Sequence, residues 1–381
     1  MSTRVLRILT RLGAGGPPQH CLIANRELAA RGYETRLAVG QCGREDLAMD
    51  YLLSAEDAVV HIPQMRPNLF HPADAAAVLH LYRLMRDWSP DIVHTHTAKA
   101  GLLGRVAAAM AGVPHIVHTF HGNVLRGYFN PVLNAAIRTV ERLLARRTDA
   151  ICVLSPQQRQ EIVEQFQIAS AAQTAVVPLG MDLPELPQAT GEFTVGWLGR
   201  LVPVKNLGLL AEVVRRTPLR FVIAGDGPER AVAAALAAEY PGRVEWLGWQ
   251  QDILPVLARC HVLVQTSRNE GTPVALIQGM GAGRPFVATR VGGVPDVAGA
   301  HSIVTAEEPE AISEALLHLS CDSAEWQWRG VEARRFALEQ YGKQRMVDQL
   351  DRLYQGLLAG APVAEASRVG AADAFLTGGQ A

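Results

Sequence analysis

The sequence lacks the features that mark membrane, secreted and nucleic-acid-binding proteins. No run approaches the ~18–20 uncharged apolar residues that a membrane-spanning helix needs. The first 16 residues contain neither a long apolar segment nor a small-residue cleavage site, so we expect no secretory signal. The formal net charge of −1 lacks the basic excess typical of a general nucleic-acid binder. We therefore expect a cytoplasmic protein without a nucleic-acid partner.

Cysteine and lysine are both scarce. The five cysteines are scattered, odd in number and free of any Cys-x-x-Cys pair, which indicates reduced thiols rather than a disulfide or zinc framework. Lysine occurs only at Lys99, Lys205 and Lys343, so arginine carries nearly all of the positive charge. A lysine inside a motif is therefore a candidate for a specific role.

What the chain does contain is α/β patterning. With 381 residues, of which 49% are hydrophobic and 19% charged, it is long enough for two globular domains. Short β-branched runs alternate with longer helical patterns, as in parallel α/β proteins. The expected strands are 5–9, 34–40, 58–63, 91–96, 114–120 and 149–155, then 193–199, 220–225, 243–248, 261–267, 285–289 and 302–304.

A proline-rich stretch without periodicity, 181–191, indicates the point where one domain ends and the next begins. We expect a first domain over 1–182, a linker over 183–191, a second domain over 192–340, a last helix over 341–360 and a loose tail over 361–381. Two doubly wound domains in tandem would face each other across a cleft, where ligands meet the carboxyl ends of both sheets.

Two strand-to-helix loops carry candidate anion-binding groups. Gly15 and Gly16 follow the first strand, where free backbone amides and the helix dipole favour an anion; a plain turn is the alternative. Arg200 and Lys205 flank the corresponding turn of the second domain and suit phosphate oxygens, with a solvated surface pair as the alternative. Two such sites would suit a diphosphate.

Two acidic residues follow strands of the second domain. Glu270 precedes Gly271 and Thr272 at the start of a helix, and a carboxylate beside exposed amides can hold several sugar hydroxyls. A helix-terminal acid stabilised by the dipole is the alternative. Asp226 ends another strand, where it would border a nucleotide or cap a helix.

Closely spaced histidines invite a metal interpretation, which we do not favour. His94 and His96 would share one face of a strand, but His115 and His118 would point to opposite faces. Neither pair has a carboxylate or cysteine partner nearby in sequence, and the chain contains no Asp-x-Asp. We expect no metal site and no cofactor.

Taken together, these motifs resemble those of glycosyltransferase family 4, the retaining group 1 enzymes with the GT-B fold. The resemblance is carried by GRLVPVKN, FVIAGDGPER, EGTPVALIQGMGAGRPFVAT and VGGVPD in the second half, and by GGPPQHCLIANRELAARGYE, HTFHG and VVPLGMD in the first. It covers the chain up to about residue 358. It implies two Rossmann-like domains and a last helix that crosses back to the first.

The resemblance also implies roles for individual residues. Arg200 and Lys205 would neutralise the donor diphosphate as it leaves, with the Gly15–Gly16 amides as a second contact. Glu270, Gly271 and Thr272 would hold hydroxyls of the donor sugar, and His121 in HTFHG would lie near the reacting centre. His121, Glu270, Arg200 and Lys205 are thus the expected catalytic set.

The chain departs from the family pattern at Gln278, where a second glutamate normally contacts the ribose. Glutamine can still accept a hydrogen bond, but an uncharged and weaker one. The expected activity is metal-independent transfer of a hexose from a nucleotide sugar to a glycan or lipid-linked acceptor. We expect the donor to be UDP-linked and the reaction to belong to bacterial surface polysaccharide synthesis. The alternatives are a UDP-sugar 2-epimerase of the same fold and a catalytically weak subunit.

One helix offers a possible contact with membranes. It carries Arg138, Arg142, Arg146 and Arg147, which could lie on anionic lipid or bind an anionic acceptor. An ordinary solvated helix face explains the same pattern. The first interpretation would place the protein peripherally on the inner membrane face.

Overall fold

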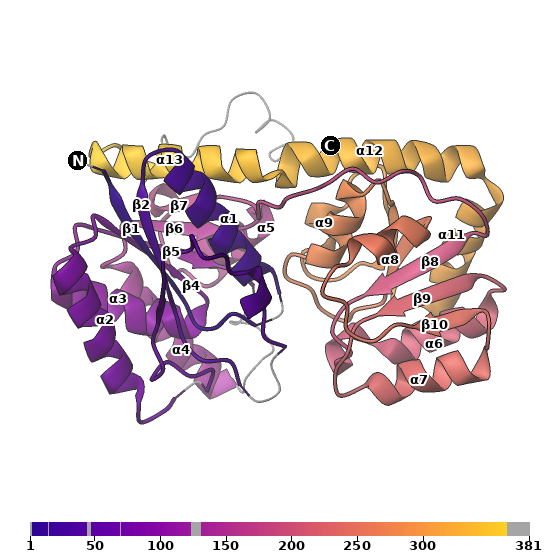
Figure 1. Ribbon diagram of the computed structural model, residues 1–381, viewed down its shortest axis with the longest axis horizontal. Helices are drawn as coiled ribbons and strands as arrows, with labels where there is room; N and C mark the ends of the chain where they lie inside the picture. Colours follow the sequence, from indigo (N-terminus) through magenta and orange to yellow (C-terminus); the bar gives the residue numbers. More distant parts are fainter. Residues whose placement is uncertain (1, 14, 44–46, 69, 123–130, 364–381) are drawn as a thin grey trace. The chain divides into compact units, whose positions relative to one another are not determined.

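The structure, a computed structural model, describes residues 2–13, 15–43, 47–68, 70–122 and 131–363 (Figure 1). Contacts divide the chain into two compact units. Unit 1 comprises Met1–Met181 and Lys343–Ala381, and unit 2 comprises Asp182–Gly342. Nearly all of the tail expected over 361–381 lies outside the described residues.

Unit 1 is built on a seven-stranded parallel sheet with the order β3-β2-β1-β4-β5-β6-β7. Its strands are β1 (Arg4–Leu9), β2 (Glu34–Val39), β3 (Val59–His61), β4 (Ile92–His96), β5 (His115–Phe120), β6 (Ala150–Val153) and β7 (Thr174–Val176). The strand order reverses between β1 and β4, and the loops that leave such a reversal at the carboxyl edge are the usual ligand site of an open α/β sheet.

Helices cover both faces of this sheet (Figure 1). They are α1 (Gly16–Ala30), α2 (Asp74–Trp88), α3 (Ala98–Ala111), α4 (Pro131–Ala145), α5 (Pro156–Gln160) and α13 (Lys343–Leu358), with short helical turns at Asp50–Leu52, Glu161–Gln165 and Ala171–Gln173. Helices α1 and α13 pack on the face that presents Val5, whereas α2 and α3 pack on the face that presents Leu6 and Ile8.

The last helix, α13, belongs to unit 1 although the whole of unit 2 precedes it in the chain. Its apolar residues recur at helical spacing, which produces one buried stripe. The stripe consists of Met346, Leu350, Leu353, Tyr354 and Leu357. This stripe packs with residues of β1, α1 and β5, so a segment from the other end of the sequence completes the hydrophobic core on one face of the first sheet.

Unit 2 repeats the architecture with a six-stranded parallel sheet of order β10-β9-β8-β11-β12-β13. Its strands are β8 (Thr194–Leu198), β9 (Arg220–Ala224), β10 (Val244–Trp246), β11 (Val262–Gln265), β12 (Phe286–Thr289) and β13 (Ile303–Thr305). Its helices are α6 (Leu207–Arg216), α7 (Arg230–Glu239), α8 (Leu254–Arg259), α9 (Val274–Gly281), α10 (Val294–Val297), α11 (Pro309–Cys321) and α12 (Ser323–Tyr341), with a 3₁₀ turn at Pro203–Lys205. Here the order reverses between β8 and β11.

The expected strands are all present, with ends that differ by a few residues, and the α/β class with two Rossmann-like domains is confirmed. Strand β7, which has three residues, was not predicted. The arginine-bearing helix is shorter than predicted, because α4 ends at Ala145 and both Arg146 and Arg147 follow it. Among the described residues, no helix combines the length and the apolar character needed to cross a bilayer.

Candidate functional site

In unit 2, Arg200, Lys205 and Glu270 follow β8 and β11, the two strands that flank the reversal of strand order. Two hydrogen bonds join the loops that leave these strands. The hydroxyl of Thr266 donates to the carbonyl of Lys205 at 3.0 Å, and the amide of Arg268 donates to the carbonyl of Val204 at 2.8 Å. One backbone–backbone and one side chain–backbone hydrogen bond therefore hold the loops together, independently of any ligand.

Glu270 is the centre of a polar cluster in the loop after β11. Its Oε1 lies 2.5 Å from Nζ of Lys205 and accepts a hydrogen bond of 2.5 Å from Oγ of Ser267. The side-chain amide of Gln265 donates to the same oxygen. The side chains of Glu270 and Lys205 are 9% and 17% exposed, so solvent screens their attraction only in part. The lysine expected at phosphate and the carboxylate expected at sugar thus form one ion pair.

Glycines determine the path of the backbone around Glu270. Gly292 has φ of +47°, and a Cβ there would lie 2.0 Å from the carbonyl oxygen of Glu270. A Cβ on Gly293 would lie equally close to the carbonyl oxygen of Gly271, and the amide of Gly293 donates to Glu270 O at 3.0 Å. Only glycine allows the loop after β12 to approach the Glu270–Gly271 backbone this closely.

Arg200 lies at the end of β8 with its side chain exposed, and it makes no ion pair or side-chain hydrogen bond with any other described residue. The neighbouring loop, after β9, approaches it closely: the amide of Leu201 donates to the carbonyl of Asp226 at 2.9 Å. Oδ1 of Asp226 accepts from the amide of Gly227 at 2.7 Å. Helix α7 begins later, at Arg230, so the alternative role of Asp226 as a helix cap is wrong.

The other predicted residues of unit 2 lie at the start of α9. Pro273 is the N-terminal cap of the helix, and Gly271 and Thr272 directly precede it. Gly271 is exposed and Thr272 is half-buried. Gln278 lies one turn into α9 and is half-buried. Its side chain makes no hydrogen bond to the rest of the described chain, so the amide is available to a ligand.

In unit 1, the predicted glycine loop leaves β1 at the reversal of strand order. Gly15 has φ of +151°, a conformation that favours glycine, and it is the N-terminal cap of α1 without a capping side chain. Pro17 and Pro18 occupy the first turn and have no amide hydrogen. Gly15 and Gly16 are therefore the amides that the N-terminus of α1 offers to an anion.

His121 follows β5 at the same carboxyl edge, and its Nε2 lies 2.9 Å from Nδ1 of His96 at the end of β4. The ring of His20, from α1, lies 5.0 Å from that of His121 and 5.5 Å from that of His96. Sequence spacing suggests a pair of His96 with His94 but not with His20, which is 76 residues away in the chain. Only the packing of α1 on the sheet brings His20 into this group.

Burial keeps these imidazoles neutral. It lowers the pKa of His121 to about 3 and holds the pKa values of His20 and His96 well below the ordinary histidine value. The neighbouring histidines and the guanidinium of Arg7 lower the pKa values of His20 and His96 further. At neutral pH each ring therefore offers one N–H donor and one nitrogen lone pair.

A buried hydrogen-bond network lies beneath the histidines. His94 and His96 share a strand face as predicted, with ring centroids 4.2 Å apart. Nδ1 of His94 lies 2.6 Å from the hydroxyl of Tyr354 on α13, and the same hydroxyl accepts a hydrogen bond of 2.9 Å from the guanidinium of Arg7. Asn25 also accepts from Arg7. Helix α13 thus reaches the strands that carry the site.

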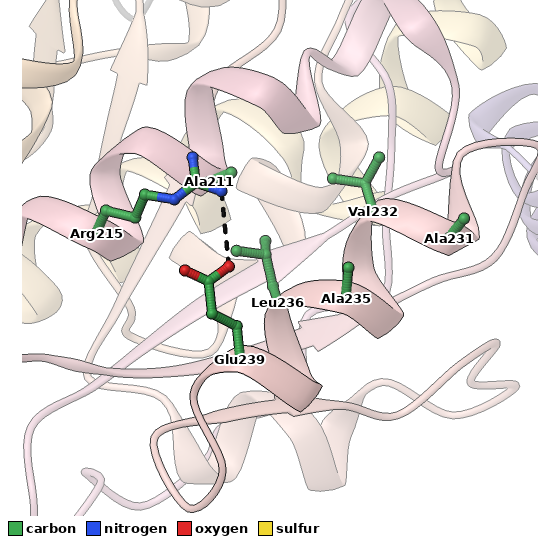
Figure 2. A pocket seen from close by; sticks show the side chains of 7 residues that line it. All are labelled: Ala211, Arg215, Ala231, Val232, Ala235, Leu236 and Glu239. Atoms are coloured by element: carbon green, nitrogen blue, oxygen red, sulfur yellow. Dashed lines mark ion pairs between the residues drawn. The ribbon is translucent and has the colours of Figure 1, made fainter.

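A surface pocket elsewhere in unit 2 contains none of the predicted residues (Figure 2). It lies between α6 and α7, and Arg215 and Glu239 form an ion pair of 3.7 Å at its edge. The remaining lining side chains are alanine, valine and leucine.

Comparison with known proteins identifies the same two halves. The pattern described as "Glycosyl transferase 4-like domain" matches residues 15–180, and that described as "Glycosyl transferases group 1" matches residues 192–322. The chain is 27% identical over 278 residues to the UDP-Gal:alpha-D-GlcNAc-diphosphoundecaprenol alpha-1,3-galactosyltransferase of Escherichia coli, covering 66% of this chain and 71% of the relative.

Solved structures agree on the fold. The sucrose-phosphate synthase from Thermosynechococcus elongatus superimposes with a TM-score of 0.80 at 19% identity, covering 94% of this chain and all of that one. Anabaena Alr3699/HepE in complex with UDP and glucose gives a TM-score of 0.77 at 19% identity, covering 93% and 99%. The chain therefore shares its fold with both of these proteins.

Proposed function

Because the chain belongs to the group 1 glycosyl transferases, we propose that it moves a hexose from a UDP-linked donor to a lipid-linked glycan acceptor, with retention of anomeric configuration. The observation that carries this proposal is the Lys205–Glu270 ion pair beside the free guanidinium of Arg200. The named donor and acceptor of the Escherichia coli relative, and the UDP bound by the Anabaena protein, support the choice of substrates.

Donor binding would rearrange the ion pair. A diphosphate carries more negative charge than one carboxylate, so it competes for the Lys205 ammonium and also engages Arg200. Glu270, released from the lysine, then accepts hydrogen bonds from sugar hydroxyls, while Ser267 and Gln265 keep its carboxylate in place. In unit 1, considered by itself, the amides of Gly15 and Gly16 are a candidate contact for an anionic group.

The chemical step in this proposal needs neither a metal ion nor a protein nucleophile. Arg200 and Lys205 stabilise the negative charge that grows on the leaving diphosphate, which is the task a divalent ion performs in other transferases. The acceptor attacks from the face that the diphosphate leaves, and a phosphate oxygen takes the acceptor proton. His121, whose pKa is about 3, is neutral at physiological pH and would hydrogen-bond the donor sugar.

The test is a thermal-shift panel with UDP, GDP, ADP and their sugar conjugates in buffer that contains EDTA. A ligand at 100 times its Kd stabilises the native state by about 2.7 kcal/mol, so UDP should raise the melting temperature clearly. The shift should disappear in Arg200→Ala and persist in Arg335→Ala, an exposed arginine on α12. A UDP shift that depends on added metal, or that survives Arg200→Ala, would refute the proposed donor site.

We also propose that the protein acts peripherally at the cytoplasmic membrane surface, through α4. This helix exposes an apolar row in which Val132, Val140 and Leu143 are 80%, 40% and 55% exposed. Arg146 and Arg147, both exposed, follow the helix and suit anionic headgroups. Arg142 instead donates to the carbonyl of Phe166, which anchors the helix to the unit.

Vesicle co-sedimentation tests the membrane contact. Vesicles with anionic phosphatidylglycerol should bind the protein, and Val132→Ser combined with Leu143→Ser should weaken binding about tenfold or more. Val331→Ser is the matched control, since Val331 is an exposed valine (59%) on α12. Equal binding to neutral vesicles, or an equal loss in the control, would contradict a role for α4.

A further inference from the structure

Three histidines of unit 1 meet at the carboxyl edge of its sheet although they come from three different elements. His20 belongs to α1, His96 ends β4 and His121 follows β5. Each offers a ring nitrogen, and these atoms all lie within 4.8 Å of one another. The geometry points to a three-histidine site for a divalent transition-metal ion of the zinc class.

Unused ring nitrogens are the first argument. His20 is 1% exposed, and within the described chain neither of its nitrogens has a hydrogen-bond partner. Nε2 of His96 and Nδ1 of His121 are likewise buried and unpartnered there. A buried polar atom left without a hydrogen-bond partner destabilises the native state. A metal ion would take up the lone pair of His20, which has no partner in the described chain, whereas at His96 and His121 it would replace their mutual hydrogen bond.

Ligand spacing is the second argument. Tetrahedral zinc with Zn–N bonds of about 2.0–2.1 Å places its ligand nitrogens about 3.3 Å apart. Nδ1 of His96 and Nε2 of His121 are already 2.9 Å apart. Small rotations of the rings would therefore complete the geometry, with the hydrogen bond between His96 and His121 exchanged for two metal bonds. Three protein ligands leave a fourth position for water.

The donor set selects the class of ion. Imidazole nitrogen suits zinc, cobalt, nickel and copper, whereas magnesium and calcium require oxygen ligands. No carboxylate belongs to this cluster among the described residues. The guanidinium of Arg7 acts electrostatically on His20 and His96, and this positive charge opposes any cation that does not bind imidazole strongly.

Such an ion would inhibit the enzyme rather than serve its chemistry. This consequence, unlike the binding itself, rests on the proposed function, in which His121 hydrogen-bonds the donor sugar. A metal ion that takes a nitrogen of His121 removes that contact. Zinc should therefore inhibit transfer, and EDTA should maintain or raise activity.

The experiment measures metal binding directly, with no need for turnover. The accessible thiols Cys42 and Cys321 compete for zinc, so both are replaced by serine in every protein tested. Cobalt titration should then give one equivalent with the intense visible absorption of a tetrahedral site, and zinc should displace it. His20→Ala and His20→Gln should each weaken zinc binding at least about tenfold, because either removes one of three ligands.

His318→Ala is the matched control, since His318 is 62% exposed and lies 2.6 Å from Glu325, a surface pair that could bind zinc adventitiously. It should leave the cobalt spectrum unchanged. The absence of a stoichiometric cobalt site overturns the inference, as does binding that survives both His20 variants or is lost with His318→Ala. Circular dichroism of the metal-free variants establishes that they are folded.

Transfer assays with and without zinc test the participation of His121. Zinc should inhibit the parent protein, and His20→Ala should relieve that inhibition. Stoichiometric binding without inhibition would exclude His121 as a ligand. If no UDP-dependent transfer is found at all, the proposed function fails while the cobalt result still stands, so the two failures are distinguishable.

Discussion

Nζ of Lys205 lies 2.5 Å from Oε1 of Glu270, although the two residues are 65 positions apart and were expected to bind different parts of a donor. In the absence of a ligand, the carboxylate of Glu270 balances the positive charge of the Lys205 ammonium group. The ion pair also links the two loops that leave β8 and β11. Binding of phosphate and binding of sugar should therefore be coupled through this pair.

Replacing Glu270 should separate the two binding events. In Glu270→Gln, Lys205 loses its competing carboxylate, so UDP should bind as tightly as in the parent protein or more tightly. Transfer should fall about 10- to 100-fold, because a hydrogen bond to a charged group contributes about 1.5–3 kcal/mol. Calorimetry with UDP and an assay of transfer measure the two effects. A parallel loss of both would show that Glu270 contributes to UDP binding itself.

Restoring the family's glutamate at Gln278 should strengthen donor binding. The side chain of Gln278 is half-buried on α9 and makes no hydrogen bond within the described chain. A charged acceptor forms a stronger hydrogen bond to ribose hydroxyls, so Gln278→Glu should lower the Kd for UDP about fivefold, equivalent to roughly 1 kcal/mol. Gln251→Glu adds the same charge at an exposed position and should have no effect. Equal changes in both variants would indicate a general charge effect.

Removing the hydroxyl of Tyr354 should destabilise unit 1. In Tyr354→Phe, Arg7 and His94 both lose a buried hydrogen-bond partner, at a cost of about 2–4 kcal/mol in unfolding free energy. Urea unfolding measures the loss, and hydrogen exchange in β4 and α13 should locate it. Tyr51→Phe, at a residue that is 38% exposed, should change stability by less than about 0.5 kcal/mol. Loss of exchange protection only in peptides of unit 2 would contradict the expectation that the destabilisation arises in unit 1.

Stability should fall as the pH drops below neutrality, because several histidines are buried in the neutral form. Burial and then the charge of Arg105 hold the pKa of His118 well below the ordinary value. The unfolded chain gains a proton at His118 as pH falls through about 6.5, while the native state does not. One such residue therefore lowers the unfolding free energy by about 1.4 kcal/mol between pH 7.5 and 5.5.

Urea unfolding at these two pH values checks this prediction. Between pH 7.5 and 5.5, the unfolding free energy of His118→Asn should fall by about 1.4 kcal/mol less than that of the parent protein. This difference does not depend on how stable the variant is at pH 7.5. His61→Asn, at an exposed histidine on β3, should follow the parent protein. An identical pH dependence in the parent and His118→Asn would mean that His118 takes up its proton over the same pH range in the native state as in the unfolded chain.

Local signals determined most of the fold. Buried parallel strands are recognisable as short runs rich in aliphatic and β-branched residues, as in VLRIL and DIVHTH, and glycine or proline marks the loops between elements. The same signals predicted the loops that carry Arg200, Lys205 and Glu270, since in a doubly wound sheet these loops lie at the ligand-binding edge. Strand β7 escaped detection because three residues are too few to show a period.

Tertiary structure alone decided which side chains meet. Ser267 and Gln265 were missed because hydrogen bonds to a carboxylate leave no periodic signal, although their closeness to Glu270 in sequence was available as a hint. His20 joins His96 and His121 only because α1 packs on that face of the sheet. Tyr354 reaches His94 across 260 positions because the apolar stripe of α13 has its complementary surface in unit 1. Sequence periodicity specifies which face of an element is buried, whereas the neighbour of that face is chosen by packing over the whole chain.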